Sequence, residues 1–207
     1  ENERSVYELR SLGWKVRRLP LFNEKDVYSL YLINKIILSY SGQKIIFICE
    51  QDQFYHDQYG VMKNLQVKFY SASSREFDNL DYDSHNFNIA IHVRRGDIMH
   101  DFSNPNLAMR YLSNDYFEKV LLQVYEHFLK MQKKPIHIWF FSQGNLEDFS
   151  VFFKFKNVHW CLNKDAQYSF LHMVYADALI TSKSSFSYKP ALLNKGIKIC
   201  PENFWHG

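Results

Sequence analysis

Glycine, proline and cysteine are all scarce in this chain of 207 residues, which has seven glycines, five prolines and three cysteines. So few glycines and prolines exclude a collagen-like or low-complexity protein. The three cysteines, Cys49, Cys161 and Cys200, are odd in number and far apart, which argues against a disulfide framework. No cysteine and histidine pair has zinc-site spacing, so we expect no structural metal.

Long apolar runs and a strong excess of one charge are also missing. No run reaches the roughly 18 apolar residues of a membrane span, so we expect no span in this chain and no secretory leader. The chain begins with Glu1 instead of methionine, as a processed or trimmed chain would. The net charge is only +3, with acidic and basic residues interspersed, so we expect no nucleic-acid partner.

The second half of the chain alternates between apolar runs and helical patterns. Short apolar runs predict five strands, at residues 87–94, 136–141, 157–161, 178–181 and 197–200. Helical patterns lie between them, at residues 113–131, 146–153, 168–175 and 187–194, with residues 96–106 as a loop. This order predicts right-handed crossovers and a parallel sheet covered on both faces. We therefore expect a Rossmann-like domain over residues 86–207.

The first part of the chain is less regular. Residues 27–40 resemble a helix, residues 44–49 and 65–70 resemble strands, and residues 71–85 read as a polar, acidic linker. The sequence therefore predicts an α/β protein with a smaller N-terminal α/β part over residues 1–85.

Candidate functional residues follow from the position of the strands, because open parallel sheets bind ligands at the carboxyl ends of their strands. Arg94 and Arg95 come after the first predicted strand, and a serine-rich run at residues 182–187 leads from the fourth strand into a helix. Guanidinium groups match phosphate oxygens, and a helix N-terminus favours anions. Together they predict a metal-independent diphosphate site. Asp165, after the third strand, could accept two hydrogen bonds from a guanine edge.

Each of these features also has a purely structural interpretation. Arginines after a strand are usually surface charges, whereas a serine-rich helix start and Asp165 are usually helix caps. His92 in an apolar strand is usually a hydrogen-bonded core residue, and the tripeptide at residues 95–97 matches an integrin-binding sequence that is common by chance. No role follows for His137, His159 and His172. A ligand site is favoured because both anion-binding features fall at one edge of the sheet.

Three motifs, in the right order, resemble those of the fucosyltransferase superfamily. Residues 92–97 read HVRRGD, which matches the HxRRGD motif of α1,2-fucosyltransferases and the HxRR motif of α1,6- and protein O-fucosyltransferases. Residues 140–142 resemble the family's next strand end, and residues 177–187 resemble the motif before its final helix. The resemblance covers residues 86–200 and is closest to the α1,2-fucosyltransferases.

The resemblance implies a GT-B-like fold in which the Rossmann-like domain holds GDP-β-L-fucose and the smaller N-terminal part, truncated or reduced, faces the acceptor. It implies inverting, metal-independent transfer of L-fucose to a glycan hydroxyl, with α1,2 as one linkage, and no cofactor besides the donor substrate. Free cysteines favour the cytoplasm. A eukaryotic enzyme trimmed of its membrane anchor would instead work in the Golgi lumen.

The resemblance also implies roles for individual residues. Donor binding would involve His92, Arg94, Arg95, Asp165, Ser184, Ser185 and Phe186. Within this set, Arg94 would contact the β-phosphate and Arg95 would support it, while His92 would orient an arginine or touch the diphosphate. The catalytic residues would be Arg94 and Asp97, with Asp101 as a second candidate base and pairing with Arg95 as another interpretation of Asp97.

Three alternatives to a fucosyltransferase stay open at this point. One is a glycosyltransferase that uses a different nucleotide sugar, and another is a non-catalytic nucleotide-binding module. The third is a recognition protein that uses the Arg-Gly-Asp loop at residues 95–97 and has no nucleotide affinity. Gln143 and Gly144 stand where the family usually has acidic residues, so the resemblance carries over no donor contact to these two positions.

Overall fold

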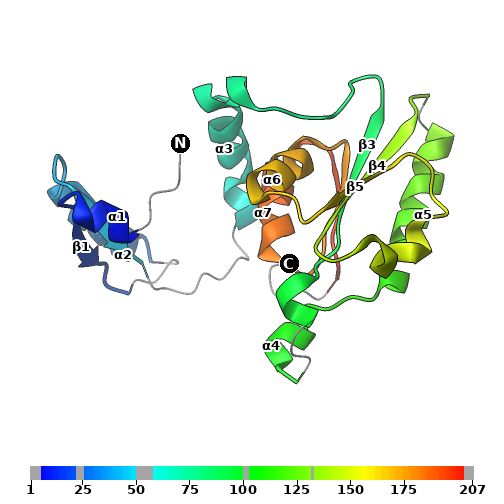
Figure 1. Ribbon diagram of the computed structural model, residues 1–207. Helices are drawn as coiled ribbons and strands as arrows, with labels where there is room; N and C mark the ends of the chain where they lie inside the picture. The colour runs from blue at the N-terminus through cyan, green and yellow to red at the C-terminus, as the bar shows by residue number, and fades with distance from the viewer. Residues whose placement is uncertain (1–5, 22–25, 50–57, 100–102, 132, 203–207) are drawn as a thin grey trace. The chain divides into compact units, whose positions relative to one another are not determined.

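The computed structural model describes residues 6–21, 26–49, 58–99, 103–131 and 133–202. The chain divides into two compact units, Glu1–Phe54 and Tyr55–Gly207 (Figure 1). The second unit therefore begins earlier in the chain than residue 86, where the sequence pattern places the start of the Rossmann-like domain.

The first unit is a small α/β arrangement. Its elements are α1 (Val6–Ser11), β1 (Lys15–Arg18), α2 (Val27–Ser39) and β2 (Ile45–Ile48). The two strands pair in parallel, with Lys15 opposite Ile45. The carboxylate of Asp26 accepts a hydrogen bond from the backbone N–H of Tyr28 and so caps α2. The helix predicted at residues 27–40 and the strand predicted at residues 44–49 are confirmed.

The second unit contains a five-stranded parallel sheet with the order β5-β4-β3-β6-β7. Its strands are β3 (Phe87–His92), β4 (Ile136–Ser142), β5 (Val158–Leu162), β6 (Ala178–Ile180) and β7 (Ile197–Ile199), which confirms all five predicted strands. The chain builds one half of the sheet outward from β3 and then returns to place β6 on the other side of β3. The order therefore reverses between β3 and β6, which makes this pair the topological switch point.

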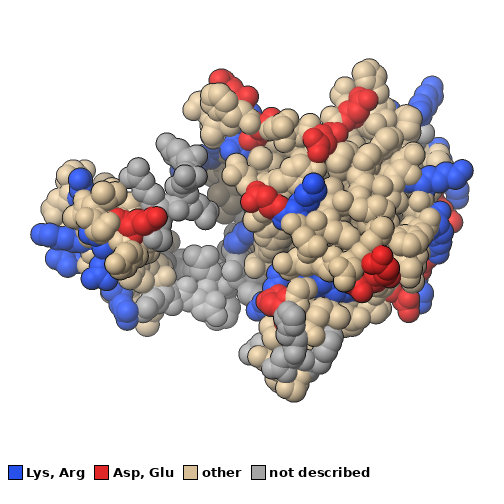
Figure 2. Space-filling model, in the orientation of Figure 1, with Lys and Arg blue, Asp and Glu red and all other residues tan. Residues whose placement is uncertain are grey.

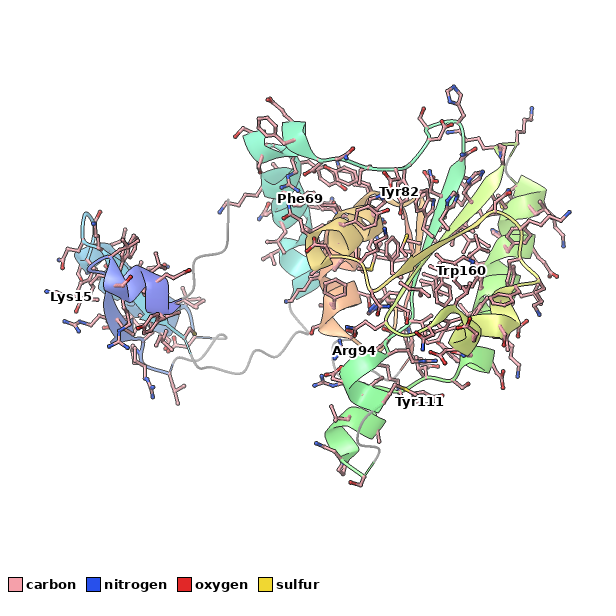
Figure 3. The ribbon with its side chains drawn as sticks, viewed as in Figure 1. Lys15, Phe69, Tyr82, Arg94, Tyr111 and Trp160 are labelled. Carbon is pink, nitrogen blue, oxygen red and sulfur yellow. The ribbon has the colours of Figure 1, made fainter. Side chains whose placement is uncertain are left out.

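Helices cover both faces of this sheet, as its continuous apolar strands predict. One face packs on α5 (Asn114–Met131) and the short 3₁₀ helix η4 (Leu146–Phe152), and the other packs on α6 (Ala166–Tyr175) and α7 (Ser185–Leu193). Trp160 lies on the α5 side and Tyr82 on the opposite side (Figure 3). The α/β fold class with a Rossmann-like parallel sheet is thus confirmed.

The strand predicted at residues 65–70 is wrong, because these residues end the helix α3 (Gln58–Tyr70). The run from Val67 to Tyr70 has high β propensity, but tertiary contacts override it. The side chains of Gln66 and Tyr70, one turn apart on α3, donate hydrogen bonds to backbone carbonyls at the end of α7, including Leu192 at 3.1 Å and Leu193 at 3.2 Å. In a strand these two side chains would share a face but lie about 13 Å apart, whereas a helix brings them next to each other, as two adjacent carbonyls require.

The segment predicted as a linker, residues 71–85, is hydrogen-bonded to the second unit. It begins with the 3₁₀ helix η2 (Ser73–Phe77). Tyr82 donates a hydrogen bond to the carbonyl of His172 at 2.7 Å, and the backbone N–H of Asp81 donates to His172 Nε2 at 3.0 Å. The predicted loop at residues 96–106 likewise contains two short helices, η3 (Gly96–Met99) and α4 (Pro105–Ala108).

On the face shown in Figure 2, acidic and basic side chains are interspersed over the surface of the second unit, and neither charge forms a large patch. None of the helices within the described residues is long and apolar enough to cross a membrane.

Candidate functional site

The two anion-binding features predicted from the sequence lie at the switch point of the sheet. β3 and β6 are hydrogen-bonded neighbours, with Ile91 opposite Ile180. Residues 92–97 leave the carboxyl end of β3, and residues 181–187 leave the carboxyl end of β6. Because the connections turn to opposite faces of the sheet, a crevice opens between them.

A buried hydrogen bond joins these two stretches. His92 Nδ1 lies 3.0 Å from the hydroxyl oxygen of Ser182, and both residues are buried. The ring of Phe186, in the first turn of α7, packs edge-on against the imidazole with centroids 5.4 Å apart. Residues about ninety positions apart in the sequence therefore form one side of a single site.

Burial keeps the imidazole of His92 neutral. Desolvation and, to a smaller extent, the nearby charge of Arg94 together lower the pKa of His92 to about 3. A neutral imidazole suits the structural interpretation, in which a core histidine is hydrogen-bonded. The imidazole of His92 also lines a cavity, so its hydrogen bond can fix the position of a residue in a ligand site.

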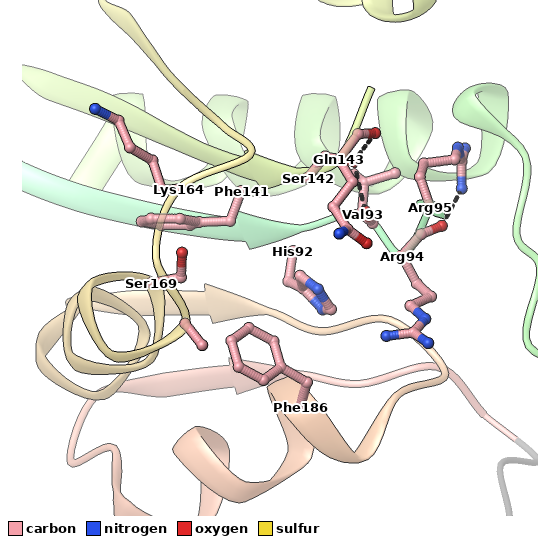
Figure 4. A pocket seen from close by; sticks show the side chains of 11 residues that line it. His92, Val93, Arg94, Arg95, Phe141, Ser142, Gln143, Lys164, Ser169 and Phe186 are labelled. Carbon is pink, nitrogen blue, oxygen red and sulfur yellow. Dashed lines mark hydrogen bonds between the residues drawn. The ribbon is translucent and has the colours of Figure 1, made fainter. Parts of the chain in front are cut away.

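The cavity at this edge has a volume of about 210 Å³. Its walls come from several segments at the carboxyl edge: His92 at the end of β3 and residues 93–95 after it, Gln143 after β4, Lys164 and Ala166 after β5, and Phe186 at the start of α7 (Figure 4). Lys164 was not singled out from the sequence. The signal available for it was its position directly after the third strand, where a basic residue adds positive charge.

Arg94 lines this cavity and has one hydrogen-bond donor without a partner among the described residues. Its Nη2 donates to Asp97 Oδ1 at 2.5 Å, but its Nε is buried and has no hydrogen-bond partner among the described residues. A buried donor without a partner is unfavourable, so the position favours an acceptor supplied from outside the chain. The interpretation that Asp97 pairs with Arg95 is wrong, since the carboxylate contacts Arg94. Asp101 lies outside the described residues.

Arg95 is buried and directed away from Asp97. Its Nη1 donates to the carbonyl oxygen of Arg94 at 2.6 Å, its Nη2 donates to Asn114 Oδ1 at 2.5 Å, and its guanidinium lies 4.9 Å from the ring centroid of Tyr111. Desolvation lowers the pKa of Arg95. These contacts fasten the loop after β3 to the start of α5 and so hold the backbone of Arg94.

The serine-rich run begins α7 as a helix cap. The side chain of Ser184 accepts a hydrogen bond from the backbone N–H of Phe186 at 3.2 Å, and buried Ser187 accepts one from the N–H of Ser182 at 3.2 Å. Ser185 is exposed. Of the three residues predicted here, Phe186 lines the cavity, whereas Ser184 and Ser185 are not part of its lining. The positive end of α7 nevertheless begins at the cavity, next to Phe186.

Asp165 caps the N-terminus of α6, which agrees with its interpretation as a helix cap. Its Oδ1 accepts hydrogen bonds from the backbone N–H groups of Gln167 at 2.8 Å and Tyr168 at 3.1 Å. Asp165 is not part of the cavity lining, although its neighbours Lys164 and Ala166 are. Its position is thus at the margin of the site.

A second cavity of about 590 Å³ adjoins the first. Arg95 and Gln143 line both cavities, so the two share a wall. The remaining lining of the larger cavity includes Gly144, Asp148 and Asn163.

The three histidines without an assigned role lie outside both cavities. His137 Nδ1 and His159 Nε2 are 2.8 Å apart on neighbouring strands, and His172 holds Asp81 as described above. Within the described ranges, no group of three histidine, cysteine or acidic residues could hold a metal ion.

His92 should make the folded protein sensitive to acid. Its pKa of about 3 lies below the value of 6.5 expected in the unfolded chain. Below about pH 6.5 the unfolded chain therefore takes up a proton that the folded chain refuses, and stability falls as the pH decreases towards 3. By pH 5 the loss of folding stability due to His92 amounts to about 2 kcal/mol. In urea unfolding at pH 7 and pH 5, His92→Gln should lose less stability between the two pH values than the wild type.

The matched control is His127→Gln, which removes an exposed histidine from α5. This variant should keep the wild-type pH dependence. An unchanged pH dependence in His92→Gln would show that His92 titrates normally in the folded protein.

No protein-family model matches the chain, and no curated protein matches its sequence. Among solved structures, the chain is similar to a crystal structure of POFUT1 in complex with GDP. The identity is 14%, the TM-score is 0.41, and the similarity covers 86% of this chain and 60% of that one. The chain thus spans about 60% of the length of that structure.

Proposed function

We propose that this chain is an inverting glycosyltransferase that moves L-fucose from GDP-β-L-fucose to a glycan hydroxyl without a metal ion, with α1,2 as one linkage. The observation that carries the proposal is the His92–Ser182 hydrogen bond at the switch point. It places Arg94, with its unused buried donor, and the start of α7 around one cavity. The HVRRGD motif at residues 92–97 supports fucose as the sugar that is transferred.

The cavity supplies positive charge for a diphosphate. Arg94 offers Nε together with its Nη groups, α7 contributes the positive end of its dipole, and Lys164 is a second basic residue among those that line the cavity. Arg95 acts through Arg94, because its hydrogen bond fixes the Arg94 carbonyl. This is the charge distribution that a leaving diphosphate requires.

The proposed reaction is a direct displacement at the anomeric carbon of fucose. The acceptor hydroxyl oxygen forms the new bond from the face opposite the diphosphate, and the bond between the anomeric carbon and the phosphate oxygen breaks. The electron pair leaves with GDP, whose growing charge Arg94 and α7 stabilise. The hydroxyl proton passes to a carboxylate or to water. Asp97 is the candidate base, since its side chain is 60% exposed beside Arg94.

Calorimetry with GDP, UDP and ADP tests the donor assignment. We expect GDP to bind most tightly, and we expect transfer from GDP-fucose to continue in excess chelator, because the positive charge comes from the chain itself. A preference for UDP or ADP would instead favour a different nucleotide-sugar donor. GDP binding without transfer or donor hydrolysis would favour a non-catalytic binding module.

Asp165→Asn separates guanine recognition from helix capping in the same experiment. Asparagine caps helices about as well as aspartate, so α6 should remain intact. Loss of the carboxylate should weaken GDP binding about 10-fold if Asp165 contacts the base, since hydrogen bonds to charged groups contribute about 1.5–3 kcal/mol. Unchanged GDP affinity would leave Asp165 with its capping role alone.

A further inference from the structure

Gln143 occupies the junction of the two cavities. It follows β4 directly and lines both the cavity of about 210 Å³ that holds Arg94 and the adjoining cavity of about 590 Å³. A ligand group that extends from the smaller cavity into the larger one must pass this side chain.

The neighbouring amide side chains of the larger cavity are bound to other protein groups. Asn114 accepts a hydrogen bond from Arg95 and donates to the carbonyl of Asp148. Asn163 exchanges two hydrogen bonds with the backbone of Gly144, at 3.1 and 3.0 Å. The side-chain amide of Gln143, in contrast, makes no hydrogen bond to any described residue. It is therefore free to bind a ligand.

Gly96 creates the space that this amide occupies. A Cβ at Gly96 would lie 2.1 Å from Oε1 of Gln143, and Gly96 has a φ of +77°, which side-chain-bearing residues rarely adopt. The motif glycine between Arg95 and Asp97 thus lets Gln143 lie against the loop after β3. Figure 4 shows the amide of Gln143 directed into the cavity, near His92.

An amide differs chemically from the acidic residues with which the sequence motif was compared. It donates through Nε2, accepts through Oε1 and carries no charge, so it matches a hydroxyl group and does not repel a diphosphate. We propose that Gln143 is a specificity-determining contact for the hydroxylated sugar attached to the diphosphate, and that it does not bind the diphosphate itself. This inference rests on the proposed function, since it assumes a nucleotide sugar in the smaller cavity.

Calorimetry of Gln143→Ala with GDP and with GDP-fucose, in the absence of acceptor, tests this inference. We expect GDP affinity to stay within about twofold of the wild type, which also shows that the variant is folded. GDP-fucose affinity should fall about 5- to 10-fold, as expected for one or two neutral hydrogen bonds. Gln167→Ala is the matched control, because it removes an exposed glutamine that lines neither cavity. It should leave both affinities unchanged.

The remaining outcomes separate the inference from the proposed function. An equal loss of affinity for GDP and GDP-fucose would overturn the inference, because the contact would then be to the diphosphate. No loss for either ligand would also overturn it, and in both cases the proposed function would stand. A wild-type protein that binds neither nucleotide would overturn both.

Discussion

Arg94→Ala should lower the rate of fucose transfer by about 10²–10³-fold, since one preorganised group that stabilises a leaving charge contributes about 3–4 kcal/mol. The physical reason is the guanidinium at the switch point, whose Nε is buried and has no partner among the described residues. GDP binding should weaken as well, because the diphosphate carries its charge before and after transfer. Steady-state kinetics with GDP-fucose and calorimetry with GDP measure the two effects.

Two further variants define the role of this arginine. Arg94→Lys keeps the positive charge but loses the planar, paired donors, so we expect it to recover only part of the activity. Arg17→Ala removes an exposed arginine of β1 that lines neither cavity, and its kinetics should match the wild type. Near-normal transfer by Arg94→Ala would overturn the assignment of the site.

Asn194→Asp should destabilise the protein by about 3–5 kcal/mol at pH 7, because it places an unpaired charge in a buried position. Asn194 is fully buried just after α7. Its Nδ2 donates to the carbonyl oxygens of Met173, Val174 and Ala176, at 3.1, 3.0 and 2.8 Å. An aspartate would direct a carboxylate at these three oxygens and could donate nothing in return. Urea unfolding of the wild type and the variant measures the difference.

Asn194→Ala distinguishes loss of the donor from introduction of charge. It removes the hydrogen bonds without adding a carboxylate, so we expect a smaller loss of about 1–3 kcal/mol. The matched control is Asn64→Asp on α3, where the side chain is exposed and the change should stay within about 0.5 kcal/mol. Equal stability of Asn194→Asp and the wild type would mean that the end of α6 does not depend on this amide.

The strands of the second unit were predictable because their residues are buried on both faces. Phe87–His92 and Ile136–Ser142 are almost entirely buried, and such strands appear in the sequence as continuous apolar runs. Where burial was partial, the pattern was ambiguous. Residues 65–70 have the composition of a strand but form the end of α3, because hydrogen bonds from Gln66 and Tyr70 to the end of α7 favour a helix.

The candidate site was predictable only in part. Position after a strand was enough to select Arg94, since parallel strands present their carboxyl ends at one edge, whereas Phe186 was selected through the resemblance of residues 177–187 to the family motif. Position could not decide which arginine Asp97 pairs with, and the structure shows that it is Arg94 instead of Arg95. Position also placed Gln143 directly after a strand, but its proposed contact depends on a close approach to Gly96 across two neighbouring connections.

The sequence by itself determined the order of strands and helices in the second unit, and therefore which residues follow each strand, because buried strands leave continuous apolar runs and helices leave apolar residues at helical spacing. Only the tertiary structure decided that β6 lies beside β3, which puts Ser182 against His92 and α7 beside Arg94. Strand order depends on contacts between residues about ninety positions apart, and local patterns carry no record of such contacts.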